Sequence, residues 1–225
     1  MIKIIIELTK LRLSLLVTFS AIFGFILAST QGINYNDLFF LFFGGWLITS
    51  SSIINNQILE KDSDGLMKRT MKRPIPTKRI SVKTSMIISF LFSFTGFLIL
   101  YYFLNFYSAF LSILSLIIYS FVYTPLKKIS SVAVFIGAFP GALPPLIGWV
   151  AATNQISIEA IIIFSIQFIW QFPHFWAIAW VSDEDYKKAG FKLLPNGGGK
   201  NFSTAINIMT YTLILLPLGL LPTIF

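Results

Sequence analysis

Two short runs of acidic residues are the clearest signs of chemistry in this 225-residue chain. Each run contributes three carboxylates, and the six residues are Glu60, Asp62, Asp64, Asp183, Glu184 and Asp185. Asn56, Glu60 and Asp64 are spaced four residues apart, so on a continuous helix their side chains share one face. Amide and carboxylate oxygens in such a row suit a hard cation such as Mg²⁺, which proteins hold through one or two carboxylates plus phosphate oxygens.

Basic residues follow both runs and could bind the anion that accompanies such a cation. Arg69 and Arg73 come soon after the first run, and a guanidinium group suits bidentate contact with phosphate. The pattern therefore predicts a site for Mg²⁺ and a diphosphate, with Asp62 outside the aligned row and facing solvent or supporting a ligand. The alternative is a solvated loop in which acids offset bases and the bases contact anionic lipid.

The elements that position these runs must be membrane-spanning helices, because the composition excludes most other classes. Hydrophobic residues make up 56% of the chain and charged residues only 12%, about half the share usual in soluble globular proteins. This excludes an ordinary soluble domain, and it excludes disorder, which requires low hydrophobicity. The absence of cysteine excludes disulfides and thiolate metal sites. Aromatic residues reach 16%, so rings are available to line a chamber and shield a carbocation.

Seven apolar segments are long enough to cross a bilayer, which takes about 20 helical residues. They run approximately over Leu13–Ser29, Leu38–Ile54, Thr84–Phe103, Ser108–Tyr123, Val132–Ala152, Ile158–Val181 and Thr204–Phe225. All 17 Lys and Arg residues fall in the N-terminal arm or after the second, fourth and sixth segments. By the positive-inside rule, the N-terminus and both acidic runs are expected on the cytoplasmic side. The sequence predicts an all-α, polytopic transmembrane bundle, whose net charge of +8 needs no nucleic acid to explain it.

Residues 56–74 resemble the first signature of the intramembrane UbiA-type prenyltransferase superfamily. That signature reads N-x-x-x-D-x-x-x-D followed by M-x-R-T-x-x-R-P, and Glu60 stands where the family usually has Asp. The segment from Tyr123 to Lys127 matches the superfamily's Y-x-x-x-K element, in which the lysine is expected to bind diphosphate.

The second acidic run narrows the resemblance to the haem O synthase branch of this superfamily. The segments that carry this likeness are Gly141–Trp149, Trp170–Trp176, Asp183–Gly190 and Leu193–Pro195. The resemblance implies transfer of a farnesyl group from farnesyl diphosphate to a vinyl group of haem b, with addition of water and with Mg²⁺ as cofactor. It also implies the bacterial cytoplasmic membrane as location, contact with membrane lipids, and haem A synthase or oxidase assembly proteins as partners.

The same resemblance assigns roles to individual residues. The catalytic residues would be Asp64, Lys127 and Asp185. The diphosphate would be bound by Asn56, Arg69, Arg73, Tyr123 and Lys127. The metal ligands would come from Asn56, Glu60, Asp64, Asp183, Glu184 and Asp185. The branch usually has D-D-Y-x-x-A-G as its second acidic motif, so Asp185 is the safer ligand there, with Asp183 as a substitute.

His174 is the only histidine in the chain, and it lies on an apolar segment among aromatic residues. A single histidine in such a place is usually a packing residue whose ring forms a hydrogen bond. In a protein that binds haem, the alternative is a contact with the iron or with a propionate.

Two other functions stay open, and the length of the chain adds an expectation. The first alternative is prenylation of another acceptor, such as a hydroxybenzoate, a naphthoate or a tetrapyrrole alcohol. The second is a transporter or lipid-binding membrane protein, although transporters usually place polar groups at mid-membrane, and here the carboxylates gather at one interface. The family typically has nine helices, so residues 1–225 are expected to form a single membrane-embedded prenyltransferase domain that lacks the last two.

Overall fold

The computed structural model describes residues 2–195 and 199–223, most of which are helical. The long helices are α2 (Leu11–Ala28), α3 (Tyr35–Leu59), α5 (Val82–Phe103), α8 (Val132–Thr153), α9 (Ile158–Val181) and α11 (Phe202–Leu220). Another membrane-length segment consists of α6 (Phe106–Ile117), the π-helix η1 (Ile118–Tyr123) and α7 (Thr124–Leu126). The short elements are α1 (Ile2–Thr9), α4 (Lys61–Leu66), α10 (Asp183–Lys188) and the 3₁₀ turn η2 (Leu221–Thr223).

Seven segments of the described chain are helical, long and apolar enough to span a membrane, which confirms the predicted bundle of seven spans. The second span is longer than the sequence predicts, because α3 continues past Ile54 to Leu59. Its last turns are polar, and each polar side chain there has a partner on another element. Asn55 accepts a hydrogen bond from Ser89, and Gln57 donates one to the carbonyl of Leu8. The helix therefore extends to Leu59, and the first acidic run follows it. The run does not continue α3, because Glu60 leaves the helical conformation and Asp62 and Asp64 lie in the separate helix α4.

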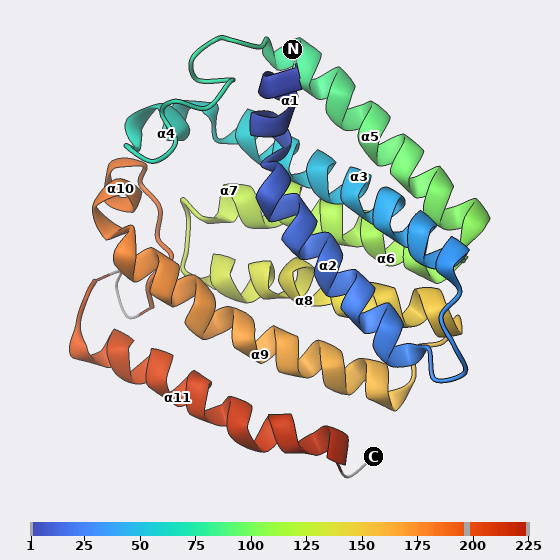
Figure 1. Cartoon of the computed structure of the whole chain (residues 1–225). Coiled ribbons are helices and arrows are strands. Elements are labelled where there is room, and N and C mark those ends of the chain that lie inside the picture. Colours follow the sequence, from blue (N-terminus) through green and yellow to red (C-terminus); the bar gives the residue numbers. More distant parts are fainter. Residues whose placement is uncertain (1, 196–198, 224–225) are drawn as a thin grey trace.

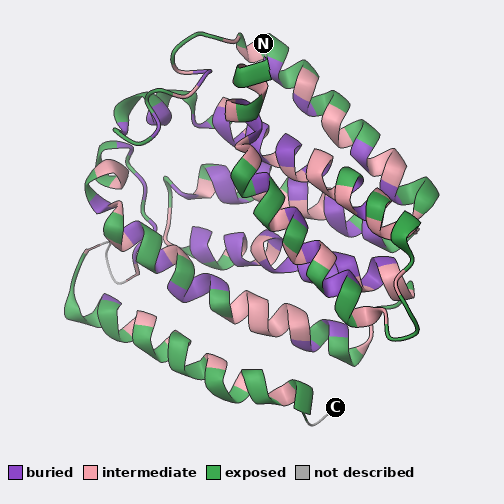
Figure 2. Ribbon diagram, in the orientation of Figure 1, coloured by how far each residue is buried: buried purple, intermediate pink, exposed green. Residues whose placement is uncertain are grey.

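Helix α8 lies at the centre of the bundle and is the most buried of the seven spans (Figures 1 and 2). It packs against α2, α6 and α9. Two glycines allow α2 and α8 to touch: a Cβ on Gly24 would lie 2.0 Å from the carbonyl oxygen of Pro145, and a Cβ on Gly148 would lie 1.8 Å from that of Ala21. Small residues serve this purpose at many transmembrane helix interfaces. Helix α11 lies on the outside, along α9.

Prolines in α8 leave backbone carbonyls without their usual helical partners, and side chains from other helices replace those partners. Pro145 has no N–H to offer the carbonyl of Gly141, four residues earlier. The Nε2 group of Gln171 on α9 donates to that carbonyl instead, at 2.9 Å. The carbonyl of Pro140 likewise accepts from the hydroxyl of Ser115 at 3.5 Å. Such replacement donors are needed in the interior of a membrane protein, because no water is present there to hydrogen-bond a free carbonyl.

The three short helices α1, α4 and α10 lie at one end of the bundle, and α4 contacts α10 (Figure 1). The two acidic runs, which are more than a hundred residues apart in sequence, therefore meet at one end of the molecule. This arrangement agrees with the prediction that both runs lie on the same side of the membrane.

Candidate active site

The first acidic run is buried and paired with basic residues from later segments. Glu60 directly follows α3 and forms an ion pair with Lys127, which follows α7. Asp64 lies in α4 with no exposed surface, and its Oδ2 accepts a hydrogen bond from Nη1 of Arg73 at 2.6 Å. Asp62, between them, is exposed, as the sequence predicts for a residue outside the aligned row. The structure thus joins into one cluster the two motifs that the sequence predicts to bind diphosphate.

Asp64 retains an oxygen that the described residues do not satisfy. Its Oδ1 is buried and has no hydrogen-bond partner among residues 2–195 and 199–223. Burial raises the pKa of the Asp64 carboxyl above its usual range, and the nearby Arg73 only partly opposes that effect. A buried acceptor without a partner is uncommon in native proteins. The carboxylate would therefore be stabilised by a further cation.

The second acidic run approaches the first through Asp185. Its two carboxylate oxygens accept hydrogen bonds from the backbone N–H groups of Lys68 and Arg69, both at 3.2 Å. Burial tends to raise the pKa of Asp185, but these two N–H groups, together with the charges of Lys188 and Arg69, outweigh it and hold the pKa below its usual range. Asp185 therefore fastens α10 to the segment that carries the arginines of the first motif.

The other two acidic residues of α10 are placed differently. Asp183 is buried and pairs with Lys187, whose Nζ lies 2.8 Å from its Oδ2, whereas Glu184 is exposed. Within the described residues, no three Asp, Glu or His side chains come close enough together to hold a metal ion between them. The six metal ligands named from the sequence therefore stay a prediction, although the unsatisfied oxygen of Asp64 and the chemistry of its neighbours fit a hard cation.

Asn56, predicted as a ligand, also has a structural partner. Its Nδ2 donates to the hydroxyl of Thr124 at 3.1 Å, and that hydroxyl donates to the carbonyl of Tyr119 at 2.8 Å. Thr124 stands where the π-helix η1 ends, so this contact ties α3 to the turn that precedes Lys127. The Nζ of Lys127 lies 4.8 Å from the ring centroid of Tyr123, within cation–π range. Contacts of Tyr123 and Thr124, in the Tyr123–Lys127 segment singled out from the sequence, therefore help to position Lys127.

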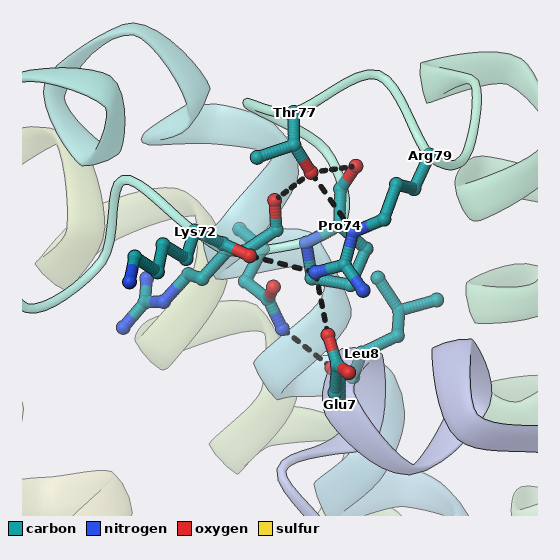
Figure 3. Close-up of polar contacts among 8 residues, drawn as sticks. Glu7, Leu8, Lys72, Pro74, Thr77 and Arg79 are labelled. Carbon is teal, nitrogen blue, oxygen red and sulfur yellow. Dashed lines mark hydrogen bonds and ion pairs between the residues drawn. The ribbon is translucent and has the colours of Figure 1, made fainter.

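The loop between α4 and α5 is held against α1 by a group of hydrogen bonds, shown in Figure 3. Nη2 of Arg79 donates to Oε2 of Glu7 and to the carbonyl oxygen of Lys72, both at 2.6 Å. Nε of Arg79 donates to the hydroxyl of Thr77, which donates to the carbonyl of Arg73 at 2.7 Å. These contacts fix the backbone of the residue whose guanidinium group holds Asp64. Arg69, by contrast, is exposed and free to turn toward a ligand.

Sequence reasoning missed Lys10 as a site residue, because it interpreted this charge only as a marker of topology. Lys10 joins α1 to α2 with a left-handed φ of 45°, and it forms no ion pair among the described residues. Burial lowers its pKa to about 7, the positive charges of Arg73 and Lys127 act in the same direction, and Asp64 and Glu60 oppose them. The side chain therefore belongs electrostatically to the cluster. The left-handed backbone conformation of Lys10 is strained for a residue other than glycine, and such strain is common at functional sites.

A mostly apolar cavity of about 520 Å³ is lined by α2, α3, α6, η1, α8 and α9. Tyr119 connects it to the charged cluster, since it lines the cavity and lies within electrostatic range of Glu60 and Arg73. Tyr119 was also missed, because aromatic residues are too frequent in this chain for one of them to attract attention. The volume is typical of a small-molecule site. A molecule with an anionic head and an apolar tail would match the two regions.

His174 lines this cavity from α9. Its ring stacks on that of Trp170, with centroids 4.4 Å apart and planes inclined by 17°. The side chain is exposed, and it forms no hydrogen bond with any residue in the described parts of the chain. The structure therefore does not support the interpretation of His174 as a hydrogen-bonded packing residue.

A helical bundle with paired acidic motifs at one end and an apolar chamber beneath them is the architecture of an intramembrane prenyltransferase. The profile of the UbiA prenyltransferase family matches residues 17–225, and the chain belongs to this family. Among its relatives, it is 54% identical to the "Protoheme IX farnesyltransferase" of Cytophaga hutchinsonii, over 97% of this chain and 77% of that one. It is 46% identical to the protein of the same name from Flavobacterium psychrophilum, over 96% of this chain and 72% of that one.

Solved structures share the fold at much lower identity. A digeranylgeranylglyceryl phosphate synthase superimposes with a TM-score of 0.81 at 19% identity, over 99% of this chain and 77% of that one. A UbiA homologue from Archaeoglobus fulgidus, bound to GPP and Mg²⁺, has a TM-score of 0.73 at 19% identity, over 96% of this chain and 73% of that one. These likenesses confirm the bundle fold.

Proposed function

We propose that this chain transfers a farnesyl group from farnesyl diphosphate to a vinyl group of haem b, with addition of water, to give haem O. The names of its relatives from Cytophaga and Flavobacterium support this donor and acceptor. The structural observation that carries the proposal is the position of a buried cluster of charges next to an apolar cavity of about 520 Å³. The diphosphate would lie at the cluster and the prenyl chain would extend into the cavity.

We infer that Mg²⁺ assists the reaction. Asp64 offers an unsatisfied oxygen, Asn56 and Glu60 precede it at four-residue spacing, and Asp185 approaches from α10. Asp183 and Glu184 are further donors in the same short helix. When bound, Mg²⁺ would neutralise charge on the departing diphosphate. The Mg²⁺ named with the Archaeoglobus homologue supports this inference.

Basic side chains would bind the diphosphate itself. Lys127 and Arg73 are already desolvated and held beside carboxylates, so they need little reorganisation to contact an anionic oxygen. Arg69 would add a bidentate contact from the exposed rim. Tyr123 orients Lys127 from beneath, and Asn56 stabilises the turn that presents it. The Lys10 ammonium, placed near the same group, adds positive charge.

The reaction then needs no protein nucleophile. The bond between the farnesyl C1 atom and oxygen breaks, and its electron pair leaves with the diphosphate. The vinyl π electrons form the new carbon–carbon bond to C1, and water adds to the resulting cation next to the porphyrin ring and releases a proton. The chain contributes charge stabilisation at the leaving group and orientation of the two substrates. Aromatic residues such as Tyr119 and Phe175, which line the cavity, would shield the allylic cation.

The chain is a multi-pass membrane protein with seven candidate spans in its described residues. We infer that it lies in the bacterial cytoplasmic membrane with both acidic runs on the cytoplasmic side, since its basic residues gather at that end. Residues 1–225 would act as one domain, because helices from both halves of the chain line the same cavity. Membrane lipids surround it, and haem A synthase or oxidase assembly proteins would receive the product.

A competition assay tests the proposal. The protein in nanodiscs would receive Mg²⁺, farnesyl diphosphate and equal concentrations of haem b and 4-hydroxybenzoate, and the products would be identified by mass spectrometry. We expect a haem adduct that has gained farnesyl plus water and that disappears with chelator. Farnesylated hydroxybenzoate would contradict the acceptor, and transfer to neither compound would contradict the enzymatic function.

A further inference from the structure

One face of α9 is unusually polar for a membrane helix. Gln167, Trp170, Gln171 and His174 follow at helical spacing, and all four line the cavity. Polar side chains within a membrane are costly unless they have partners or a function. Gln171 has a partner in the carbonyl of Gly141. His174 has none within residues 2–195 and 199–223, so its ring nitrogens are available to a ligand in the cavity.

The stacking of His174 on Trp170 limits how the imidazole can be oriented. The rings are nearly parallel, at 17°, with centroids 4.4 Å apart. Stacking of this kind favours one orientation of the imidazole and so restricts the positions of its two nitrogens. A metal ligand needs such restriction, because affinity depends on holding the donor atom in place.

Few residues in this cavity could bind haem iron. Proteins use His, Cys, Met or Tyr as axial ligands, and only His174 and Tyr119 among the lining residues belong to these types. Tyr119 lies within electrostatic range of Glu60, whose charge would disfavour the negative charge of an iron-bound phenolate. The neutral imidazole of His174 meets no such obstacle. His174 lies on α9, and the charged cluster is formed by other elements, namely α3, α4 and the segments after them.

We infer that His174 is an axial ligand to the iron of the acceptor haem and that its face of α9 holds the macrocycle. The inference rests on the proposed function and extends it, since it assigns the acceptor's position. Haem would be anchored through its iron, with Trp170 behind the imidazole. The vinyl groups at the macrocycle edge could then be turned toward the charged cluster, where the allylic carbon is released.

Two probes separate iron ligation from simple packing: haem b, read by its Soret absorption, and metal-free protoporphyrin IX, read by fluorescence. The variant His174→Phe keeps an aromatic ring against Trp170 but removes both nitrogens, and His174→Gln provides a second, polar variant. We expect each to bind haem b at least about tenfold more weakly and with a shifted Soret band. Affinity for metal-free protoporphyrin IX should stay within about twofold of wild type, which also shows that the variants are folded.

Tyr119→Phe is the matched control, because it removes the other candidate ligand from the same cavity. It should leave the Soret band of bound haem b unchanged. A wild-type Soret band and affinity in both His174 variants, or a band shift only in Tyr119→Phe, would overturn the inference. Failure of the proposed function looks different: wild-type protein would then farnesylate no porphyrin, whatever the Soret band of its haem complex.

Discussion

At the residue scale, the site is a set of buried charges that are only partly neutralised. Glu60 and Asp64 each have one cationic partner, and Asp64 keeps one oxygen without any in the described residues. Lys10 adds a positive charge that has no ion-pair partner there. Groups arranged in this way lower the stability of the ligand-free protein. They would gain stabilisation if a metal and a diphosphate bound there, as the proposed function requires.

Binding should therefore stabilise the protein through Asp64. Mg²⁺ with a non-hydrolysable farnesyl diphosphate analogue, at about 100 times the dissociation constant, adds about 2.7 kcal/mol to the free energy of unfolding. That corresponds to roughly 5–10 °C in the thermal midpoint. Asp62→Asn, the control at an exposed carboxylate of the same run, should show the full shift, and Asp64→Asn should show little of it. An equal shift in the two variants would contradict the role of Asp64.

The pKa of Lys10 gives a prediction about pH. Because burial lowers this pKa from 10.5 to about 7, the unfolded chain holds the proton more tightly than the folded protein does. The cost in stability is full below about pH 7 and fades as the pH rises from there toward 10.5. Replacing Lys10 by Met should therefore raise the thermal midpoint of the ligand-free protein more at about pH 6 than at about pH 9.

The same Lys10→Met variant should bind farnesyl diphosphate more weakly, since it loses a positive charge near the proposed diphosphate site. Differential scanning at the two pH values and equilibrium binding measure the two effects. A pH-independent change in midpoint, together with unchanged affinity, would show that Lys10 lies outside the site's electrostatics.

At the element scale, the sequence predicts the membrane spans but not the irregular turns within them or the contacts between them. The length and hydropathy of each segment suffice to predict a span, because a bilayer accepts little else. The π-helix η1 leaves no such pattern, although Pro125 directly after Thr124 marks the place where regular helix is interrupted. Sequence spacing aligned Asn56 with Asp64, but only the fold shows that Asn56 contacts Thr124. Contacts across many residues depend on packing, which spacing along the chain does not contain.

The close approach of α2 and α8 gives a prediction about packing. A methyl group on Gly148 would lie 1.8 Å from the backbone oxygen of Ala21, so Gly148→Ala must push the two helices apart. We expect a loss of about 1–3 kcal/mol in the free energy of unfolding, with a widened cavity and reduced turnover. Gly219→Ala in α11 is the control, because its Cβ would meet no atom within 4 Å. Equal stability of the two variants, measured by thermal unfolding in detergent, would argue against this packing.

At the scale of the whole molecule, two regions with different chemistry share one chamber. The charged cluster at the end of the bundle contains Glu60, Asp64 and Lys127, and the apolar cavity extends along α8 and α9. Tyr119 lines the cavity and lies within electrostatic range of Glu60 and Asp64. In the proposed function, the cluster would hold the head of the prenyl donor, and the cavity would hold its tail and the acceptor.

The most direct measurement compares the initial rate of haem farnesylation in wild type, Asp64→Asn and Asp62→Asn, in nanodiscs with Mg²⁺, by mass spectrometry of the farnesyl-plus-water adduct. If the buried cluster drives departure of the diphosphate, Asp64→Asn should lose at least about 100-fold in rate, and Asp62→Asn should stay close to wild type. Binding of haem b, measured in parallel, should be unchanged in both. A Mg²⁺-dependent rate in Asp64→Asn equal to that of wild type would contradict the account.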